Sequence, residues 1–199
     1  TPGAQQLLMP LVQEAVNQGV VYVVFIASYP DVMDAIAKSG MEYTFLKGNF
    51  FMQNFELYQT ADIRDHDQIF MPTGRGKAPF VHTRDIGEIA AKALQDPVRF
   101  KGETIYITGP ESMDHYRAAG IFSEVLGRKI EYREPDDDTY RNVMSERGFS
   151  DEYIEAMIQV FGKIRKGQVS QTSGSVRRIL GREPATLEEY VSEKKELFE

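Results

Sequence analysis

Tyr43 and Lys47 form a pair whose spacing matches a known catalytic arrangement, a phenol that donates a proton and a cation that lowers its pKa. That arrangement requires a helix, on which residues four apart share a face with their Cβ atoms about 5–6 Å apart. The residues between them are mostly β-branched or aromatic, and Gly40 precedes them, which predicts a strand. On a strand the two residues would lie about 13 Å apart. We therefore do not expect them to act together.

Other catalytic and ligand-binding patterns are missing from the sequence. It contains no cysteine, which excludes a thiol nucleophile, a disulfide framework and a cysteine-ligated metal. His66, His82 and His115 have no partners at metal-ligand spacing, and no Gly-x-Ser-x-Gly supports a serine hydrolase. Neither GxxxxGKS/T nor GxGxxG occurs. The glycines of Gly74–Lys77 lead into Pro79 rather than into a helix, which predicts a turn.

Charge and composition limit the partners of the chain. Its 199 residues include 23 basic and 30 acidic side chains, which gives a net charge of −7, and 42% of the residues are hydrophobic. Such an acidic chain is not suited to bulk attraction to nucleic acid or to an anionic membrane, and we expect contact with neither. The longest apolar run, Val20–Ala27, is shorter than the roughly 20 residues that cross a bilayer. The absence of cysteine fits the reducing cytoplasm, where we expect the protein.

The first elements that would position a site alternate between helix and strand. Residues 4–18 predict a helix that ends at Gly19, and residues 31–38 predict a second helix that ends at Gly40. Val20–Ile26 and Tyr43–Lys47 are apolar runs without alternation, which predicts adjacent parallel strands covered on both faces. The order strand, helix, strand implies a right-handed crossover.

The rest of the chain becomes increasingly helical. We expect an α/β fold in which a parallel sheet of the nucleotide-binding type carries a small α-rich C-terminal cap. The expected division places the sheet domain, with its inserted short strands, at residues 1–110 and the cap or substrate region at residues 111–199. The predicted short strands are 68–71, 79–82, 104–108 and 129–133, and the predicted helices are 50–60, 85–94, 114–126, 138–147, 151–166, 176–180 and 187–198.

Five short sequence blocks follow one another along most of the chain. Residues 43–55 read YTFLKGNFFMQNF, against the pattern YT-x-LRP-x-FFM-x-NF, and residues 74–86 read GRGKAPFVHTRDI, against GDGK-x-x-FVD-x-RDIA. The later blocks contain TGPE, SEVLGR, and GREP followed by LEEY. In this order they resemble the NmrA-like family, an atypical branch of the short-chain dehydrogenases and reductases. Lys47-Gly48 stands where the family usually has Arg-Pro. Without the proline, the backbone just after the strand would be less restricted.

The resemblance implies a partial Rossmann-type fold that holds NADP or NAD, with NADPH favoured by the family. In such folds the cofactor lies across the carboxyl ends of the strands. By similarity, Asn49 would hydrogen-bond near the carboxamide and Phe50 would form a wall beside the ring. The cofactor contacts implied in this way are Thr1, Pro2, Ser28, Asn49 and Phe50.

The resemblance also implies where reaction and substrate binding would take place. Ser28 and Tyr29 lie where a proton donor would lie, although a serine that ends a strand also serves as a turn or helix cap. Phe51, Met52 and Phe55 would line a substrate pocket between residues 49–55 and the helices from about residue 138 to 166. These aromatic residues also fit the buried stripe of an amphipathic helix, and that alternative stays open.

Two functions follow from the resemblance. The first is an NAD(P)H-dependent reductase of a small electron-poor molecule such as a quinone, an enone or an imine, for which the cofactor supplies the chemistry and the protein supplies orientation. The second is a non-catalytic redox sensor that binds the dinucleotide and acts through a protein partner. The protein partners to consider are a second copy of the chain and a regulatory protein. An open apolar pocket would favour the reductase, and a pocket filled by side chains would favour the sensor.

The family pattern begins in the middle of its fold. Thr1-Pro2-Gly3 resembles the end of the fourth strand of the family's sheet, so the first three βα units and their glycine-rich turn are not among these residues. We expect that the 199 residues belong to a longer chain, or are ordered pieces of one joined across gaps.

This expectation leads to a prediction about cofactor affinity. The pyrophosphate of a dinucleotide is normally held by backbone N–H groups at a glycine-rich turn. Losing three such charge-assisted hydrogen bonds, at about 1.5–3 kcal/mol each, weakens binding by several orders of magnitude. A polypeptide of only these residues should bind NADPH or NADH no more tightly than about millimolar in calorimetry. Micromolar binding would mean that the phosphates are held at a place that the sequence patterns do not reveal.

Overall fold

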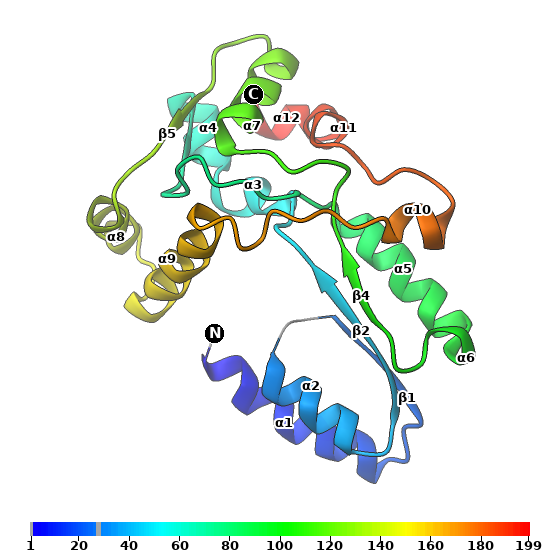
Figure 1. Cartoon of the computed structure of the whole chain (residues 1–199). Helices are drawn as coiled ribbons and strands as arrows, with labels where there is room; N and C mark the ends of the chain where they lie inside the picture. Colours follow the sequence, from blue (N-terminus) through cyan, green and yellow to red (C-terminus); the bar gives the residue numbers. More distant parts are fainter. Residues whose placement is uncertain (1, 27–28) are drawn as a thin grey trace.

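A parallel three-stranded sheet forms the centre of the lower half of the molecule in Figure 1. The computed structural model describes residues 2–26 and 29–199. The sheet has the order β1-β2-β4, with β1 at Tyr22–Ile26, β2 at Glu42–Gly48 and β4 at Thr104–Ile107. Val24 pairs with Thr44, and Leu46 pairs with Ile105. The predicted parallel pairing of the first two strands is confirmed. Tyr43 and Lys47 therefore lie on a strand, at a spacing that rules out joint catalysis.

Helices pack on both faces of this sheet. Helices α1 (Pro2–Asn17) and α2 (Pro30–Lys38) lie on one side, and α5 (Thr83–Gln95) lies on the other, followed by the short α6 (Pro97–Phe100) (Figure 1). The apolar side chains of α5 recur at helical spacing and are buried, as the sequence predicts. The helix begins at Thr83 because the His82 side chain accepts a hydrogen bond from the Arg84 N–H at 2.9 Å. Helix α10 (Ser175–Leu180), from the C-terminal third of the chain, packs against α5.

Strand β1 differs from the expectation that it is covered on both faces. It is the edge strand of the described sheet, and its side chains are only half-buried, with Ile26 48% exposed. Val21, just before it, is 78% exposed. Apolar runs without alternation therefore identify the strand correctly but do not establish that both of its faces are covered.

Two further predictions of strand structure are corrected. Pro2 was expected at the end of a strand, but it is the first residue of α1. Residues 79–82 do not form a strand, because Pro79 has no N–H to donate and the segment pairs only through isolated bridges. These bridges join Val81 to Phe51 and Ala78 to Met113.

The upper half of the molecule is mostly helical around a second, two-stranded parallel sheet. Strand β3 (Gln68–Phe70) pairs with β5 (Glu131–Arg133). Several helices begin where the sequence predicts, because an Asp, Ser or Thr side chain accepts a hydrogen bond from a backbone N–H of the first turn. The helices here are α3 (Gln53–Tyr58), α4 (Thr60–His66), α7 (His115–Leu126), α8 (Asp137–Glu146), α9 (Asp151–Arg165), α11 (Leu187–Glu193) and α12 (Lys195–Phe198).

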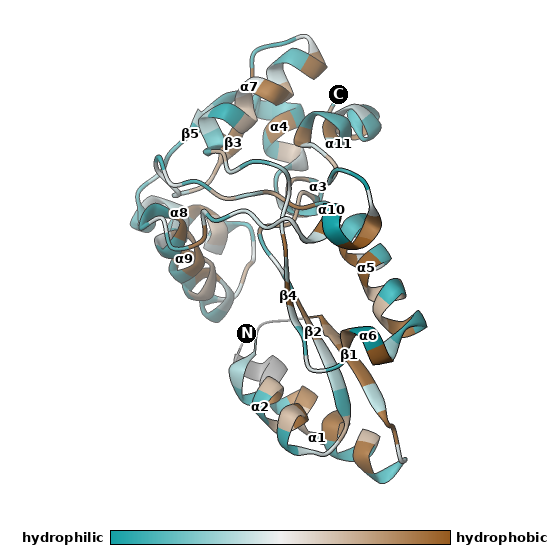
Figure 2. Cartoon of the chain, turned by 45° about the vertical axis from the view of Figure 1, so that its right-hand side comes forward, coloured by the Kyte–Doolittle hydropathy of each residue, from teal (hydrophilic) through white to brown (hydrophobic). Residues whose placement is uncertain are grey.

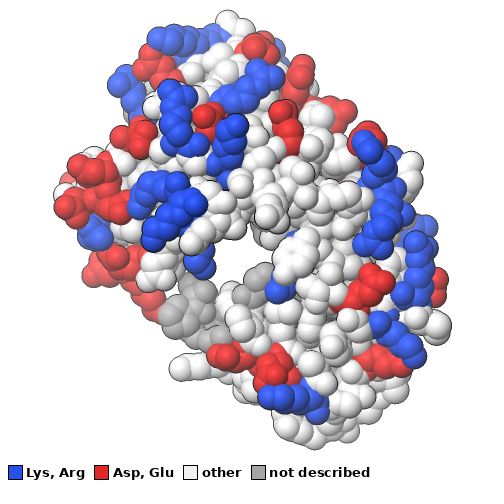
Figure 3. Space-filling model, viewed as in Figure 1, with Lys and Arg blue, Asp and Glu red and all other residues white. Residues whose placement is uncertain are grey.

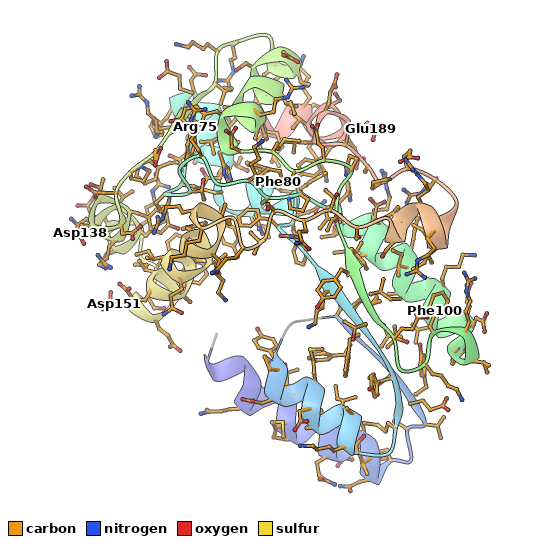
Figure 4. The ribbon with its side chains drawn as sticks, in the orientation of Figure 1. Arg75, Phe80, Phe100, Asp138, Asp151 and Glu189 are labelled. Carbon is orange, nitrogen blue, oxygen red and sulfur yellow. The ribbon has the colours of Figure 1, made fainter. Side chains whose placement is uncertain are left out.

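The largest hydrophobic core joins the middle of the chain to its C-terminal third. Phe80, labelled near the centre of Figure 4, is buried in this core between segments that lie on either side of residue 110. Phe100, also labelled, belongs to a separate cluster beneath α5 and the sheet. Figure 2 shows the corresponding hydrophobic colouring along the strands and the inner faces of the helices. The division at residue 110 stays a prediction.

Two glycines of the five sequence blocks are required because backbone segments approach them closely. A Cβ atom at Gly76 would lie 2.2 Å from the carbonyl oxygen of Ile164 in α9, and one at Gly109 would lie 1.9 Å from the carbonyl oxygen of Phe80. Both distances are far shorter than any van der Waals contact, so neither position accepts a larger residue without movement of the backbone. Gly76 thereby sets how closely α9 approaches the turn at residues 74–77.

We predict that Gly76→Ala lowers the free energy of unfolding by about 3 kcal/mol, because the added methyl group must push α9 away from the turn. Urea denaturation followed by circular dichroism measures the change.

Gly87→Ala is the matched control. Gly87 lies inside α5, and nothing comes within 4 Å of a Cβ atom added there. Alanine is the better helix former, so this variant should gain about 0.5–1 kcal/mol. Similar losses in both variants would show that Gly76 is not limited by its contact with α9.

Candidate functional site

A cavity of about 670 Å³ lies between the carboxyl end of β2 and the helices α8 and α9. Asp138 and Asp151, labelled in Figure 4, mark the first turns of these two helices. Figure 3 shows a hollow in this part of the molecule whose rim consists mainly of uncharged residues. The cavity is therefore found where the sequence predicts a pocket, between residues 49–55 and the helices from about residue 138 to 166.

Aromatic rings and methionines form most of the cavity wall. The rings of Phe149 and Tyr153 stack with their centroids 5.2 Å apart, and Tyr58 lies 6.1 Å from Tyr153. Methionine side chains are flexible and polarisable, so this part of the wall can adapt to ligands of different outline. The wall therefore suits a flat apolar ligand. Its methionines are Met71, Met144 and Met157.

A few polar side chains interrupt this apolar wall. Lys163 carries the single full charge among the lining residues that the structure describes. Burial raises the pKa of Tyr140 to about 12, and burial followed by a hydrogen bond with Tyr58 raises the pKa of Tyr153. These phenols therefore stay protonated at neutral pH and can donate hydrogen bonds. The side chain of Asn54 also lines the cavity and makes no hydrogen bond within the described part of the chain.

Four of the residues predicted for the site line the cavity: Tyr29, Asn49, Phe50 and Phe51. Tyr29 immediately precedes α2, and the other three follow β2, so the ends of neighbouring parallel strands bring them together. Asn49 also has a structural role. Its Oδ1 accepts a hydrogen bond from the Phe50 N–H at 2.8 Å, and its Nδ2 donates to the Val169 carbonyl at 3.0 Å.

The structure places two predicted substrate residues elsewhere. Met52 and Phe55 are almost completely buried in the main core and are not part of the cavity wall. Phe55 packs between Phe80 and Phe122, with ring centroids 5.4 and 5.0 Å away. The prediction of substrate contacts at both positions is corrected, because the helix turns these side chains inward. Thr1 and Ser28 lie outside the described residues, and Pro2 is described only as the beginning of α1.

The sequence predicts that the helices of residues 138–166 border the cavity, but it does not identify which residues of α9 do so. Ile154, Ile158, Phe161 and Ile164 form the buried stripe of this helix, but further apolar residues extend beyond it. A helix that only covers a core needs one such stripe. The apolar residues of α9 outside its buried stripe are the sequence signal that a second face of this helix lines a cavity. The additional cavity residues are Tyr153, Met157 and Val160.

A buried polar network supports the floor of the cavity. The Tyr132 hydroxyl donates to the carbonyl oxygen of Met71 at 2.7 Å. The Thr73 hydroxyl lies 2.9 Å from the Tyr132 oxygen and 2.7 Å from Nδ1 of His115. Because the Tyr132 proton is used on Met71, the Thr73 proton goes to Tyr132, and Nδ1 of His115 donates to Thr73. This arrangement holds Met71, a cavity residue, in place.

His115 is neutral in this network. Its Nε2 is buried without a hydrogen-bond partner in the described structure, and it faces aromatic rings that include Phe80 at 5.3 Å. A proton on Nε2 would place a charge in this apolar region. Burial accordingly lowers the pKa of His115 to about 4.

The parallel sheet with helices on both faces, and the cavity at the carboxyl edge of its strands, define a Rossmann-type α/β protein. Residues 10–191 match the NmrA-like family, and the chain belongs to that family. Among the described residues, no helix is both long and apolar enough to cross a membrane.

Curated relatives match the greater part of the chain. Prestalk A differentiation protein A of Dictyostelium discoideum is 30% identical over 156 residues, which are 78% of this chain and 51% of the relative. NAD(P)H azoreductase of Xenophilus azovorans is 28% identical over 155 residues, which are 78% of this chain and 54% of the relative. The chain thus spans about half the length of the curated relatives it matches.

A solved structure shares the fold. The crystal structure of an NADPH-dependent quinone oxidoreductase from Escherichia coli, in complex with NADPH, superposes with a TM-score of 0.83 at 18% identity. The match covers 94% of this chain and 70% of that protein. At this identity the likeness concerns the fold alone.

We predict that His115 makes stability dependent on pH. Its pKa is lowered from 6.5 to about 4 by folding, so between these values the unfolded chain binds a proton that the folded chain does not. The contribution of neutral His115 to the free energy of unfolding should be fully present above pH 6.5. The free energy of unfolding should then fall by about 3 kcal/mol as the pH approaches 4. Denaturant titrations across this range measure the slope.

His115→Gln should remove this part of the slope, whatever its effect on absolute stability. His66 is exposed, and His66→Gln provides the matched control, which should retain the slope of the original protein. An unchanged slope in His115→Gln would contradict the assignment.

Proposed function

We propose that the cavity binds the acceptor of an NAD(P)H-dependent reductase, a small, flat, electron-poor molecule such as a quinone, an azo compound, an enone or an imine. The observation that carries the proposal is an open, aromatic-walled cavity at the carboxyl edge of a parallel sheet. One relative is named an NAD(P)H azoreductase, and a protein of the same fold is named an NADPH-dependent quinone oxidoreductase. Azo compounds and quinones are both flat conjugated acceptors.

The residues of this chain fit the ring half of a nicotinamide cofactor. Tyr29, Asn49 and Phe50 surround the strand ends, and the uncommitted carboxamide of Asn54 can pair with the carboxamide of the ring. For the phosphates, the sequence contains no glycine-rich turn of the known patterns. When bound, a reduced nicotinamide would supply the hydride.

The side chains of the cavity would orient the acceptor and hydrogen-bond to it. Stacking between aromatic rings holds a flat molecule in one plane and excludes water from its faces. The protonated phenol of Tyr153 can donate a hydrogen bond to a carbonyl or azo group. A donor at this position withdraws electron density from the acceptor and so favours its reduction.

The open cavity favours the reductase over the non-catalytic sensor. A sensor needs only to hold the dinucleotide, and its pocket can be filled by side chains. Here the volume of about 670 Å³ is sufficient for a molecule of two or three fused rings. The apolar wall around this volume is accessible to a ligand, because side chains of the described residues do not fill it.

The proposal is tested by filling the cavity. We predict that Met157→Trp lowers kcat/KM for a quinone such as menadione about tenfold or more, because the indole occupies the space of the acceptor. NADPH oxidation is followed spectrophotometrically, with the protein expressed together with any sequence that its gene encodes on either side of residues 1–199. The dissociation constant of NADPH should stay within about twofold of the original value.

Gln159→Trp is the matched control, since it adds the same side chain to the exposed face of the same helix. It should leave both constants unchanged. A protein that binds NADPH but reduces no quinone, azo compound, enone or imine would contradict the proposed function.

A further inference from the structure

A second pocket, of about 460 Å³, adjoins the aromatic cavity at the ends of β2 and β4. Residues 168, 169 and 171–173, from the segment that connects α9 to α10, form one wall of it. The two spaces share Gly48, Asn49 and Val169 as a partition. Their linings differ in character, because the second pocket is lined largely by lysine, amide and hydroxyl side chains. These are Lys47, Gln168, Gln171, Thr172 and Ser173.

Hydrogen bonds fix this wall to both strands. Asn49 at the end of β2 donates to the Val169 carbonyl at 3.0 Å. The Ser173 N–H donates to the Thr108 hydroxyl at 2.8 Å, and the Ser173 hydroxyl donates to the Tyr106 carbonyl at 2.6 Å. The segment is therefore held on both sides of the pocket, and the pocket is formed before any ligand binds.

Lys47 is a half-buried cation without an anionic partner. Its Nζ lies 5.5 Å from the centre of the Tyr106 ring, and no carboxylate of the described residues is within ion-pair distance of it. Lys101 offers a comparison, because it pairs at 3.0 Å with Glu42 at the other end of the same strand. A partly desolvated ammonium group gains most from an anion that also fits the space beside it.

The remaining side chains of the pocket suit an oxyanion. Gln168, Gln171 and Thr172 make no side-chain hydrogen bonds within the described part of the chain, so their N–H and O–H groups are available. No Asp or Glu belongs to the described lining, although the chain carries 30 acidic residues. One cation with several neutral donors and no carboxylate is the composition expected of a site for a carboxylate, sulfonate or phosphate group.

We propose that the second pocket is an oxyanion subsite in which Lys47 binds the charge. Because the partition is shared with the aromatic cavity, the oxyanion is carried by the flat ligand of that cavity or binds as a free ion beside it. The preferred acceptors are then aromatic molecules with an acidic substituent. This refinement rests on the proposed function for the identity of the flat ligand, but the subsite itself does not require turnover.

The test compares two azobenzenes that differ in one group, 4-(phenylazo)benzoate and its neutral amide, 4-(phenylazo)benzamide. Their dissociation constants are measured by calorimetry without NAD(P)H, so no reduction takes place. The original protein should bind the carboxylate at least about tenfold more tightly than the amide. Lys47→Met should abolish this preference, and Lys47→Arg should retain it, because the charge remains.

Lys166→Met is the matched control, since it removes the same charge from an exposed position at the end of α9. The preference for the carboxylate should persist in this variant. Inorganic phosphate then distinguishes the two sources of the oxyanion. A carboxylate preference shows an oxyanion carried by the ligand, whereas calorimetric binding of phosphate that is lost in Lys47→Met, without a carboxylate preference, shows a free ion.

Equal binding of the two azobenzenes by the original protein together with no Lys47-dependent binding of inorganic phosphate, or a preference that survives in Lys47→Met, would overturn the proposal. Failure of the reductase function gives a different result. In that case the carboxylate preference and its loss in Lys47→Met would remain, while NADPH oxidation with every acceptor would be absent.

Discussion

The side chain of Asn49 connects the end of β2 to the segment between α9 and α10. Together with the hydrogen bonds of Ser173 to Thr108 and Tyr106, this connection holds the segment at the carboxyl ends of the strands, where the helical half meets the sheet. It also creates the partition between the aromatic cavity and the polar pocket. The amide serves this purpose because it offers an acceptor to the adjacent Phe50 N–H and a donor to a distant carbonyl at once.

The position of α9 depends on several contacts that reinforce one another. Gly76 permits its backbone to approach the turn at residues 74–77, and Arg165 at its end forms a two-point ion pair with Asp137 of α8 at 2.8 and 2.9 Å. A similar pair joins Arg147, at the end of α8, to the buried Asp62 of α4. Helices held in this way can leave a cavity open between them, since the surrounding core does not collapse into it. The cavity therefore depends on the backbone contact at Gly76 and on the ion pairs that hold α8 and α9 in place.

The sequence predicted the elements more reliably than their environment. Apolar runs and glycine stops identified β1, β2 and α5 to within a few residues, because these signals are local. Whether β1 is covered on both faces depends on its neighbours, and no local pattern contains that information. At the site, Asn49–Phe51 could be predicted because strand ends meet at one edge of a sheet. Met52 and Phe55 could not be separated from them, since the tertiary packing that buries both side chains in the core has no local signal. The sequence pattern pairs Lys47 with Tyr43, whereas the place of Lys47 in the second pocket depends on residues more than 120 positions away.

The distribution of charge agrees with the chemistry proposed for the cavity. An acceptor that receives a hydride gains negative charge on its oxygen or nitrogen, and nearby carboxylates would oppose that change. The chain is acidic overall, yet the described linings of both pockets contain lysines and neutral donors and no carboxylate. Charges on the outer surface are screened over about 8–10 Å, so the potential inside the pockets depends mainly on the groups that line them. Lys163 and Lys47 therefore have a greater influence on a bound acceptor than the net charge of −7. An acidic protein can in this way provide a positive environment for a reaction that creates an anion.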